Sequence, residues 1–283
     1  MDENNKMVET QLTKCLNCGT EFHGKFCPEC GQRADTKRFT VKFIFTNLLQ
    51  AILSNDGGVW ITIKTLFTSP GQMVVDILDG KRKSYFSPFP MLFLVLSMYI
   101  VIATSTGSYS KSSDEMFDDE EEVVVKTEDK AEYGALVARK VKYILGEMGE
   151  FSDNHYSTVF ILTIPIYIFS ARICFGKRNR KRYNWGEYCI PMIYSLIMVV
   201  FYQCLSSIVY LFSTGISKKM FLLSFVVNIA AFTACFKKMM EFNTGKMIRR
   251  SILMWFFYWV SLIFLIIVGV GIITVFVALY YGL

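Results

Sequence analysis

The sequence predicts an all-α polytopic membrane protein with about five transmembrane helices and a small head near its N-terminus. Of the 283 residues, 53% are hydrophobic and only 19% are charged, whereas soluble domains carry about 25% charged residues. The mean hydropathy is +0.36. Long stretches carry no charge, while one internal stretch is densely acidic. This pattern excludes an ordinary soluble globule, a disordered chain and a small disulfide scaffold.

The transmembrane helices are predicted where apolar runs approach the ~20 residues that a helix needs to cross the bilayer core. The first is expected to begin near Pro90, because proline is tolerated in the first turn of a helix. The five expected spans are residues 86–104, 156–176, 188–213, 220–236 and 251–281.

The distribution of Lys and Arg predicts the orientation of these spans. Residues 172–187 hold six basic and one acidic residue, and residues 237–250 hold five basic and one acidic. Residues 105–155 hold six basic and thirteen acidic residues. Because cytoplasmic loops carry the excess of Lys and Arg, we expect a multi-pass protein of the cytoplasmic (inner) membrane. Its N-terminus is then cytoplasmic, its 105–155 loop lies outside, and no secretory signal is expected.

Two parts of the expected outer loop differ in pattern. Residues 114–122 form an acidic run, which is typical of solvated, disordered surface. Within residues 130–150, Val137, Val141 and Ile144 recur at helical spacing. We expect an amphipathic helix there, packed on the outer side of the bundle.

Two C-x-x-C pairs form the strongest motif in the chain. Cys15 and Cys18 make the first pair, Cys27 and Cys30 make the second, and a glycine follows each. Two thiolates at this spacing can bind one side of a tetrahedral ion, and the second pair closes the other side. The motif predicts a zinc ribbon at residues 15–35. Its Zn²⁺ is expected to be structural, because four protein ligands leave no position for a catalytic water.

The competing interpretations of this motif are disulfides, a redox pair and an iron site of rubredoxin type. The cytoplasmic placement argues against disulfides. His23 lies between the pairs and is interpreted as a surface residue, and residues 1–14 are expected to be disordered. The remaining cysteines lack metal-ligand spacing and are interpreted as small buried apolar side chains: Cys174, Cys189, Cys204 and Cys235.

Residues 36–84 are predicted to form short amphipathic helices that lie on the inner leaflet. Ser69 and Pro70 are typical of a helix start, and Gly80 is typical of a helix end. The cations Lys81, Arg82 and Lys83 follow. They either contact anionic lipid head groups or only enforce the orientation of the first span.

A set of ordered motifs gives this chain a family resemblance. In chain order they are Cys15-x-x-Cys18-Gly19, Phe26-Cys27-x-x-Cys30-Gly31-Gln32, Pro70-Gly71 and Gly80-Lys81-Arg82-Lys83-x-Tyr85-x-x-Pro88. With these motifs the chain resembles a bacterial integral-membrane protein family with an N-terminal zinc ribbon, several transmembrane helices and no assigned function. The resemblance spans about residues 15–103. It implies that the head and the Pro-Gly to Gly-Lys-Arg segment form one unit, and it implies no activity.

The predicted membrane interior is almost free of ionisable groups. Gln203 and Asn228 are the central polar residues, and both are neutral. They either make hydrogen bonds between helices or line a path for a solute. No catalytic constellation, P-loop or dinucleotide-binding motif is present in the sequence.

The function hypotheses follow from the closed cysteine site and the apolar interior. The first is a non-enzymatic adaptor or regulator whose cytoplasmic head and interfacial helices dock a protein partner at the bilayer. The alternative is a transporter or lipid-handling protein with a path near Gln203 and Asn228. A weaker third hypothesis is a membrane enzyme that acts on lipid or wall precursors. The net charge of the head is too small to predict nucleic-acid binding, and a homo-oligomer is left open.

Overall fold

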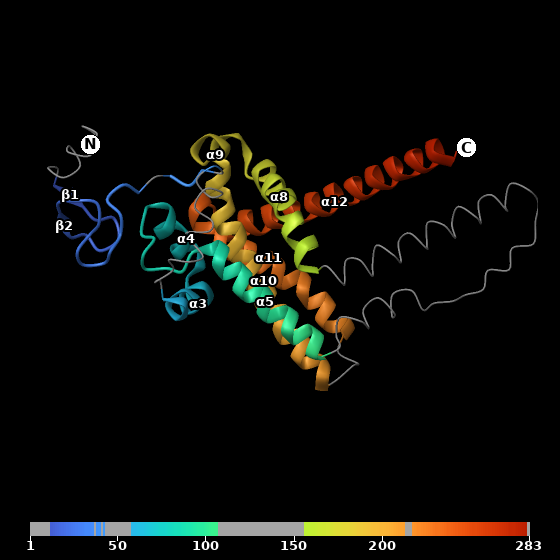
Figure 1. The fold of residues 1–283 in the computed structure, drawn as a ribbon, viewed down its shortest axis with the longest axis horizontal. Helices are drawn as coiled ribbons and strands as arrows, with labels where there is room; N and C mark the ends of the chain where they lie inside the picture. Colours follow the sequence, from blue (N-terminus) through green and yellow to red (C-terminus); the bar gives the residue numbers. More distant parts are fainter. Residues whose placement is uncertain are drawn as a thin grey trace, which may run out of the picture.

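A computed structural model describes residues 12–36, 38–40, 42, 58–106, 156–212 and 217–281 (Figure 1). The acidic run expected at 114–122 and the amphipathic helix expected at 130–150 lie outside these residues. Most of the N-terminal segment expected to be disordered lies outside them too. Thr13 and Lys14, at the end of that segment, form a strand.

The head is a small ribbon of two strands and irregular turns. β1 (Thr13–Lys14) and β2 (Glu21–Phe22) pair antiparallel, and an isolated bridge joins Phe26 to Arg33. Its buried apolar core consists of Cys15, Phe22 and Cys27. Domains below ~40 residues usually need a metal or disulfides to stay folded. Three buried side chains are a small core for a folded unit.

The rest of the described chain is helical. The helices are α3 (Val59–Thr68), α4 (Pro70–Leu78), α5 (Pro88–Thr106), α8 (Tyr156–Cys174), α9 (Gly176–Arg182), α10 (Trp185–Phe212), α11 (Ser217–Met240) and α12 (Thr244–Tyr281). As predicted, α4 has Ser69 at its N-cap and Pro70 in its first turn, and Gly80 follows it with a φ of +106°.

Four of the described helices are long and apolar enough to span a membrane: α5, α10, α11 and α12. This fits a membrane protein and approaches the predicted count of five. The second expected span corresponds to α8. The apolar stretch of α8, Ile161–Cys174, is shorter than the apolar helices of the other four spans. The long helices also extend beyond the apolar runs used to predict them. α11 continues through Lys237 to Met240, and α12 already begins at Thr244.

α10 is the central helix of the bundle. It packs against α5 and α11 and also contacts α3, α4 and α8, while α12 packs against α8 and α11. In Figure 1, α5, α10 and α11 run side by side, and α12 points away from them toward the C-terminus. Every residue of α10 from 186 to 197 is buried. The first half of α10 is therefore the core around which the other helices are arranged.

The short helices α3 and α4 belong to this core. Leu66 of α3 and Met73 and Val74 of α4 are fully buried. Gly71 brings α4 close to α11, since a Cβ there would lie 2.8 Å from the Ala234 carbonyl oxygen. Sequence periodicity predicted helices that lie on the inner leaflet. In the structure, α3 packs on α4 and α10, and α4 packs on α10 and α11, while Trp60 of α3 remains 76% exposed. Their position relative to the leaflet stays a prediction.

α5 begins about one third of the way along α10. The hydroxyl of Tyr194 donates to the Phe86 carbonyl oxygen at 2.7 Å, and Thr62 of α3 accepts a hydrogen bond from the Phe86 N–H at 2.8 Å. Residues 185–194 of α10 therefore extend past the start of α5, by ~15 Å at 1.5 Å per residue. This extension lies on the side where the ribbon sits (Figure 1).

Candidate metal centre and its docking surface

The four cysteines of the predicted motif converge in the ribbon. Their Sγ atoms all lie within 4.8 Å of one another, and the Cys15–Cys30 and Cys18–Cys27 sulfur pairs are 3.5 Å apart. A tetrahedral ion with ~2.3 Å bonds to sulfur separates its ligands by ~3.8 Å. The cluster therefore has the size and ligand number of a four-thiolate metal site. It is the one such cluster within the residues that the structure describes.

The two C-x-x-C pairs fold into matching turns, offset by twelve residues. Gly19 and Gly31 have φ angles of +83° and +70°, which glycine adopts without a steric cost. Each glycine N–H donates to the carbonyl of the first cysteine of its pair at 2.9 Å. The N–H groups of Cys15 and Cys27 donate to the carbonyls of Thr20 and Gln32. The backbone thus brings both cysteine pairs into the cluster in the same way.

The thiols differ in their surroundings. Hydrogen bonds with the side chain and backbone of Thr20 lower the pKa of Cys18 to about 6. Burial raises the pKa of Cys30 to about 11. A bound cation favours the thiolate at all four positions, because ligand cysteines are deprotonated on coordination. The donor set fits a soft divalent cation such as Zn²⁺.

The ribbon docks on residues 80–84, which we call the docking loop. The Gln32 side-chain oxygen accepts hydrogen bonds from the N–H groups of Arg82 at 3.1 Å and Lys83 at 3.3 Å. The Asn17 side-chain oxygen accepts from the Ser84 N–H at 3.2 Å and from the Ser84 hydroxyl at 2.9 Å. Three consecutive backbone amides of the loop therefore donate to the ribbon.

Gly80 allows the ribbon to approach this loop closely. A Cβ at Gly80 would lie 2.7 Å from Cδ1 of Leu16, the residue after the first metal-ligand candidate. Below the loop, Asp76 of α4 accepts hydrogen bonds from Lys81 at 3.1 Å and from the Tyr85 hydroxyl at 3.1 Å. The loop is thus positioned by α4 on one side and by the ribbon on the other.

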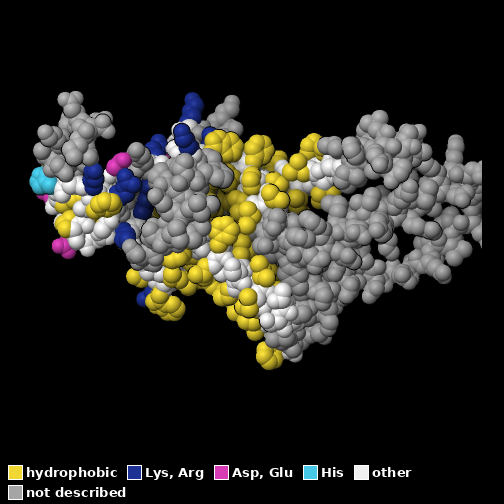
Figure 2. Space-filling view, viewed as in Figure 1, with side chains coloured by type: hydrophobic (Ala, Val, Ile, Leu, Met, Phe, Trp, Pro, Cys, Tyr) yellow, Lys and Arg dark blue, Asp and Glu magenta, His cyan; other side chains and the backbone are white. Residues whose placement is uncertain are grey.

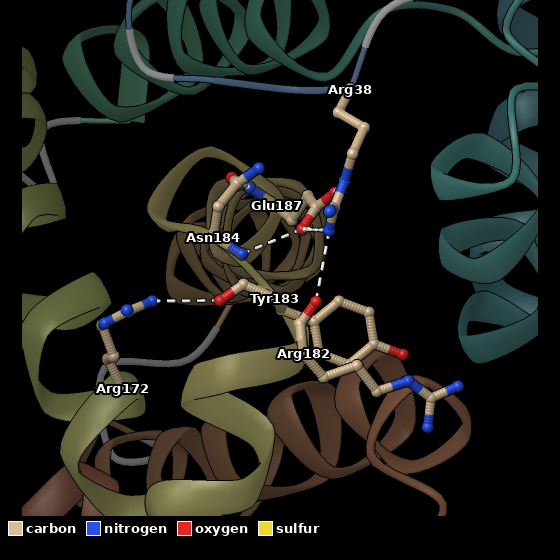
Figure 3. Close-up of polar contacts among 6 residues, drawn as sticks. All are labelled: Arg38, Arg172, Arg182, Tyr183, Asn184 and Glu187. Carbon is tan, nitrogen blue, oxygen red and sulfur yellow. Dashed lines mark hydrogen bonds and ion pairs between the residues drawn. The ribbon is translucent and has the colours of Figure 1, made fainter.

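A second anchor holds the segment that leaves the ribbon (Figure 3). Arg38 forms two hydrogen bonds with the Glu187 carboxylate, at 2.7 and 2.8 Å, and also donates to the Arg182 carbonyl. Glu187 accepts from the Asn184 N–H, and Asn184 accepts from the Glu187 N–H. This reciprocal pair is a capping box that starts α10. Gly186 leaves room for the incoming backbone, because a Cβ there would lie 2.6 Å from the Phe39 carbonyl oxygen.

The three cations proposed as lipid contacts lie around this docking surface. Lys81 pairs with Asp76. The Arg82 guanidinium carbon lies 3.9 Å from the centre of the Phe39 ring, and burial lowers the pKa of Arg82 to about 10. Lys83 is half-buried, with its Cε 3.8 Å from the Cβ position of Gly31. Lipid contact at these residues stays a prediction, but Lys81 and Arg82 have protein partners.

Gln203 and Asn228 lie on α10 and α11, which pack against each other. Both side chains are half-buried. The Asn228 amide donates to the Ser224 carbonyl of its own helix at 2.8 Å. That hydrogen bond satisfies one donor locally, and a solute path at these two residues stays untested.

Sequence reasoning missed the residues that join the ribbon to the helices. The Asn184-x-x-Glu187 pattern was a readable sign of a helix start, but nothing local connects it to Arg38. Gln32 is part of the resemblance motif, although no role was assigned to it. Asn17 had no signal, because its partner Ser84 is distant in the sequence.

The fold and the cysteine cluster define a class of protein: a helical chain with helices long and apolar enough to span a membrane and a small head whose four cysteines could hold a metal ion. A comparison with protein families finds that residues 56–100 match the model of a family described as "Protein of unknown function (DUF3667)". The matched segment contains α3, α4, the docking loop and the first part of α5. Comparisons with curated proteins and with solved structures find no match.

Proposed function

We propose that this chain is a non-enzymatic membrane adaptor whose zinc-bound ribbon presents a surface to a protein partner at the cytoplasmic face. The observation that carries the proposal is the closed cluster of four thiols, docked at one end of the helical bundle. Four protein ligands complete the coordination of Zn²⁺, so the metal would have a structural role. Bound Zn²⁺ would supply folding free energy to the ribbon, on the order of 10 kcal/mol in small zinc domains.

The charge distribution supports a cytoplasmic ribbon. Lys and Arg side chains gather where the ribbon meets the helices, and apolar side chains cover the helices beyond (Figure 2). Lys237 and Arg249 are exposed at this end of the bundle. Cytoplasmic ends of membrane helices carry this excess of positive charge.

The ribbon also exposes apolar side chains that its own fold does not use. Leu12 is 60% exposed and Phe26 is 59% exposed. Phe26 immediately precedes Cys27 and takes part in the bridge to Arg33, so its backbone is held while its ring is exposed. Aromatic side chains, Phe among them, are enriched in the buried cores of protein interfaces. We assign the partner-binding role to this part of the ribbon.

The test is affinity purification of the full chain from native membranes, with zinc and co-purifying proteins quantified. Cys15→Ser/Cys18→Ser is expected to lose both zinc and a stoichiometric partner. Phe26→Ser is expected to keep zinc and lose the partner, and His23→Ala, another exposed ribbon substitution, is expected to keep both. A partner that persists with Phe26→Ser and with the double cysteine variant would overturn the adaptor proposal.

A further inference from the structure

We propose that metal binding and ribbon docking are coupled, so that the ribbon holds the docking loop only when its four cysteines hold a metal. The inference rests on the proposed zinc site and extends it to a conformational role. The bound ion would keep two ribbon side chains, Asn17 and Gln32, where they accept hydrogen bonds from residues 82–84. Loss of the ion would release the loop.

The residues that contact the docking loop lie at the two C-x-x-C turns in the sequence. Leu16 and Asn17 are the two residues between Cys15 and Cys18, and Gln32 is the second residue after Cys30. Each of these residues therefore lies inside or directly beside a metal-binding turn. Without the ion, the core of Cys15, Phe22 and Cys27 would have to keep both turns in place, and a core of this size is too small to do so.

The contacts between ribbon and docking loop are neutral hydrogen bonds that depend on geometry. Both acceptors are neutral side-chain amide oxygens, and the donors include three backbone N–H groups. Hydrogen bonds of this kind weaken steeply when distance or angle is lost, whereas a contact between opposite charges tolerates displacement. The docking contacts therefore require the turn geometry that the metal would enforce.

The segment that leaves the ribbon is held to the helices by a separate contact. Arg38 binds Glu187, and Phe39 lies under the Arg82 guanidinium. Arg38 lies beyond the last cysteine, and its ion pair uses no metal-binding turn. A released ribbon would remain attached close to its docking loop, and its return would be an intramolecular step at high effective concentration. Release and return would thus be reversible.

A control position for Asn17 lies in the second turn of the ribbon. Glu29 occupies the place in the second turn that Asn17 occupies in the first, one residue before the second cysteine of its pair. The Glu29 side chain is exposed. Substitution of Glu29 perturbs an equivalent turn without touching the docking loop.

The experiment is amide hydrogen exchange on the full chain in lipid nanodiscs, read at residues 82–84 and at α4 as an internal reference. Chelation of zinc is expected to raise exchange at residues 82–84 at least about tenfold and to leave α4 unchanged. Asn17→Ala/Gln32→Ala is expected to give the same rise with full zinc content. Glu29→Ala is expected to change neither exchange nor zinc content.

The outcomes distinguish a failure of the proposed coupling between metal binding and ribbon docking from a failure of the metal assignment. A chain that loses zinc on chelation while exchange at residues 82–84 stays unchanged would overturn the coupling and leave the zinc ribbon intact. A chain that binds no metal at all would overturn both. If Asn17→Ala/Gln32→Ala leaves exchange at residues 82–84 unchanged, the docking contacts themselves are refuted.

Discussion

The guanidinium carbon of Arg82 lies 3.9 Å from the centre of the Phe39 ring, and the Arg82 backbone N–H donates to Gln32. One residue of the docking loop therefore contacts both the ribbon and the segment that leaves it. The side chain covers an aromatic face, and the backbone holds a turn beside a candidate metal ligand. This double contact makes Arg82 the junction between the head and the helices.

Substitution of Arg82 should separate these two roles. Arg82→Met removes the cation–π contact, which is worth ~0.5–2 kcal/mol, and keeps the backbone hydrogen bond. We expect a loss of about 1 kcal/mol in the free energy of unfolding of the full chain in detergent. Lys64→Met, at an exposed lysine of α3, is the control. Equal losses for the two variants would contradict the assignment.

Substitution of Gly80 should undock the ribbon. Gly80→Ala introduces a Cβ 2.7 Å from Leu16 at a φ of +106°, a conformation that non-glycine residues rarely adopt. We expect faster amide exchange at residues 82–84 and a loss of ~1–3 kcal/mol in stability.

Gly245→Ala is the matched control for Gly80. A Cβ at Gly245, in the first turn of α12, would meet nothing within 4 Å, and alanine is a better helix former than glycine. Gly245→Ala is therefore expected to be neutral or stabilising. A Gly80→Ala chain with unchanged exchange at residues 82–84 would refute the close contact with Leu16.

The Arg38–Glu187 pair should respond unequally to removal of either partner. The Glu187 side chain is only 7% exposed, whereas the Arg38 side chain is 66% exposed. Arg38→Ala leaves a buried carboxylate without its bidentate partner, which costs ~1–3 kcal/mol. Glu187→Gln leaves Arg38 free to reach water and is expected to cost less. Chemical denaturation of both variants checks the order, and the reverse order would show that the carboxylate is satisfied without Arg38.

Acid should destabilise the docking loop through Asp76. Burial raises the pKa of this carboxyl, but hydrogen bonds from Gln72, Lys81 and Tyr85 outweigh burial and hold the pKa below its ordinary value of 3.8. A carboxyl with a depressed pKa in the folded state contributes stability above its unfolded pKa, and that stability is lost as the pH falls through the folded pKa.

The expected result is a loss of stability below about pH 4 that Asp76→Asn makes smaller. Thermal unfolding between about pH 3 and pH 7 measures it. Asp79→Asn, at an exposed carboxyl just after α4, is the control and should leave the pH dependence as in the wild type. An Asp76→Asn chain with an unchanged pH profile would remove Asp76 from this role.

The membrane helices could be predicted from sequence because each is a long run of apolar residues, and that signal is local. Their ends could not, because polar residues continue the helices. α11 runs through Lys237 and Lys238, where a cation near a helix C-terminus is favourable. α10 begins at Trp185 because Asn184 and Glu187 cap it.

The four cysteines could be predicted because ligand spacing is also local. The docking of the ribbon could not, because Gln32 and Arg82 are far apart in the chain and no periodicity links them. The same limit explains the short helices. An amphipathic face predicts burial, but it does not say whether lipid or the neighbouring helices α10 and α11 will cover Met73 and Val74.

The extension of α10 past the start of α5 has a consequence for how the molecule unfolds. Residues 185–194 lie on the ribbon side of the start of α5, in a helix that packs against α4, α8 and α11, and a bilayer aligned with α5 would leave them in water. Removal of apolar surface from water stabilises that stretch, whereas helices within lipid gain little from the same effect. Urea should therefore melt the ribbon-side half first. Detergent composition should govern the unfolding of the helices embedded in lipid. The chain would then show two unfolding transitions, one sensitive to urea and one sensitive to detergent.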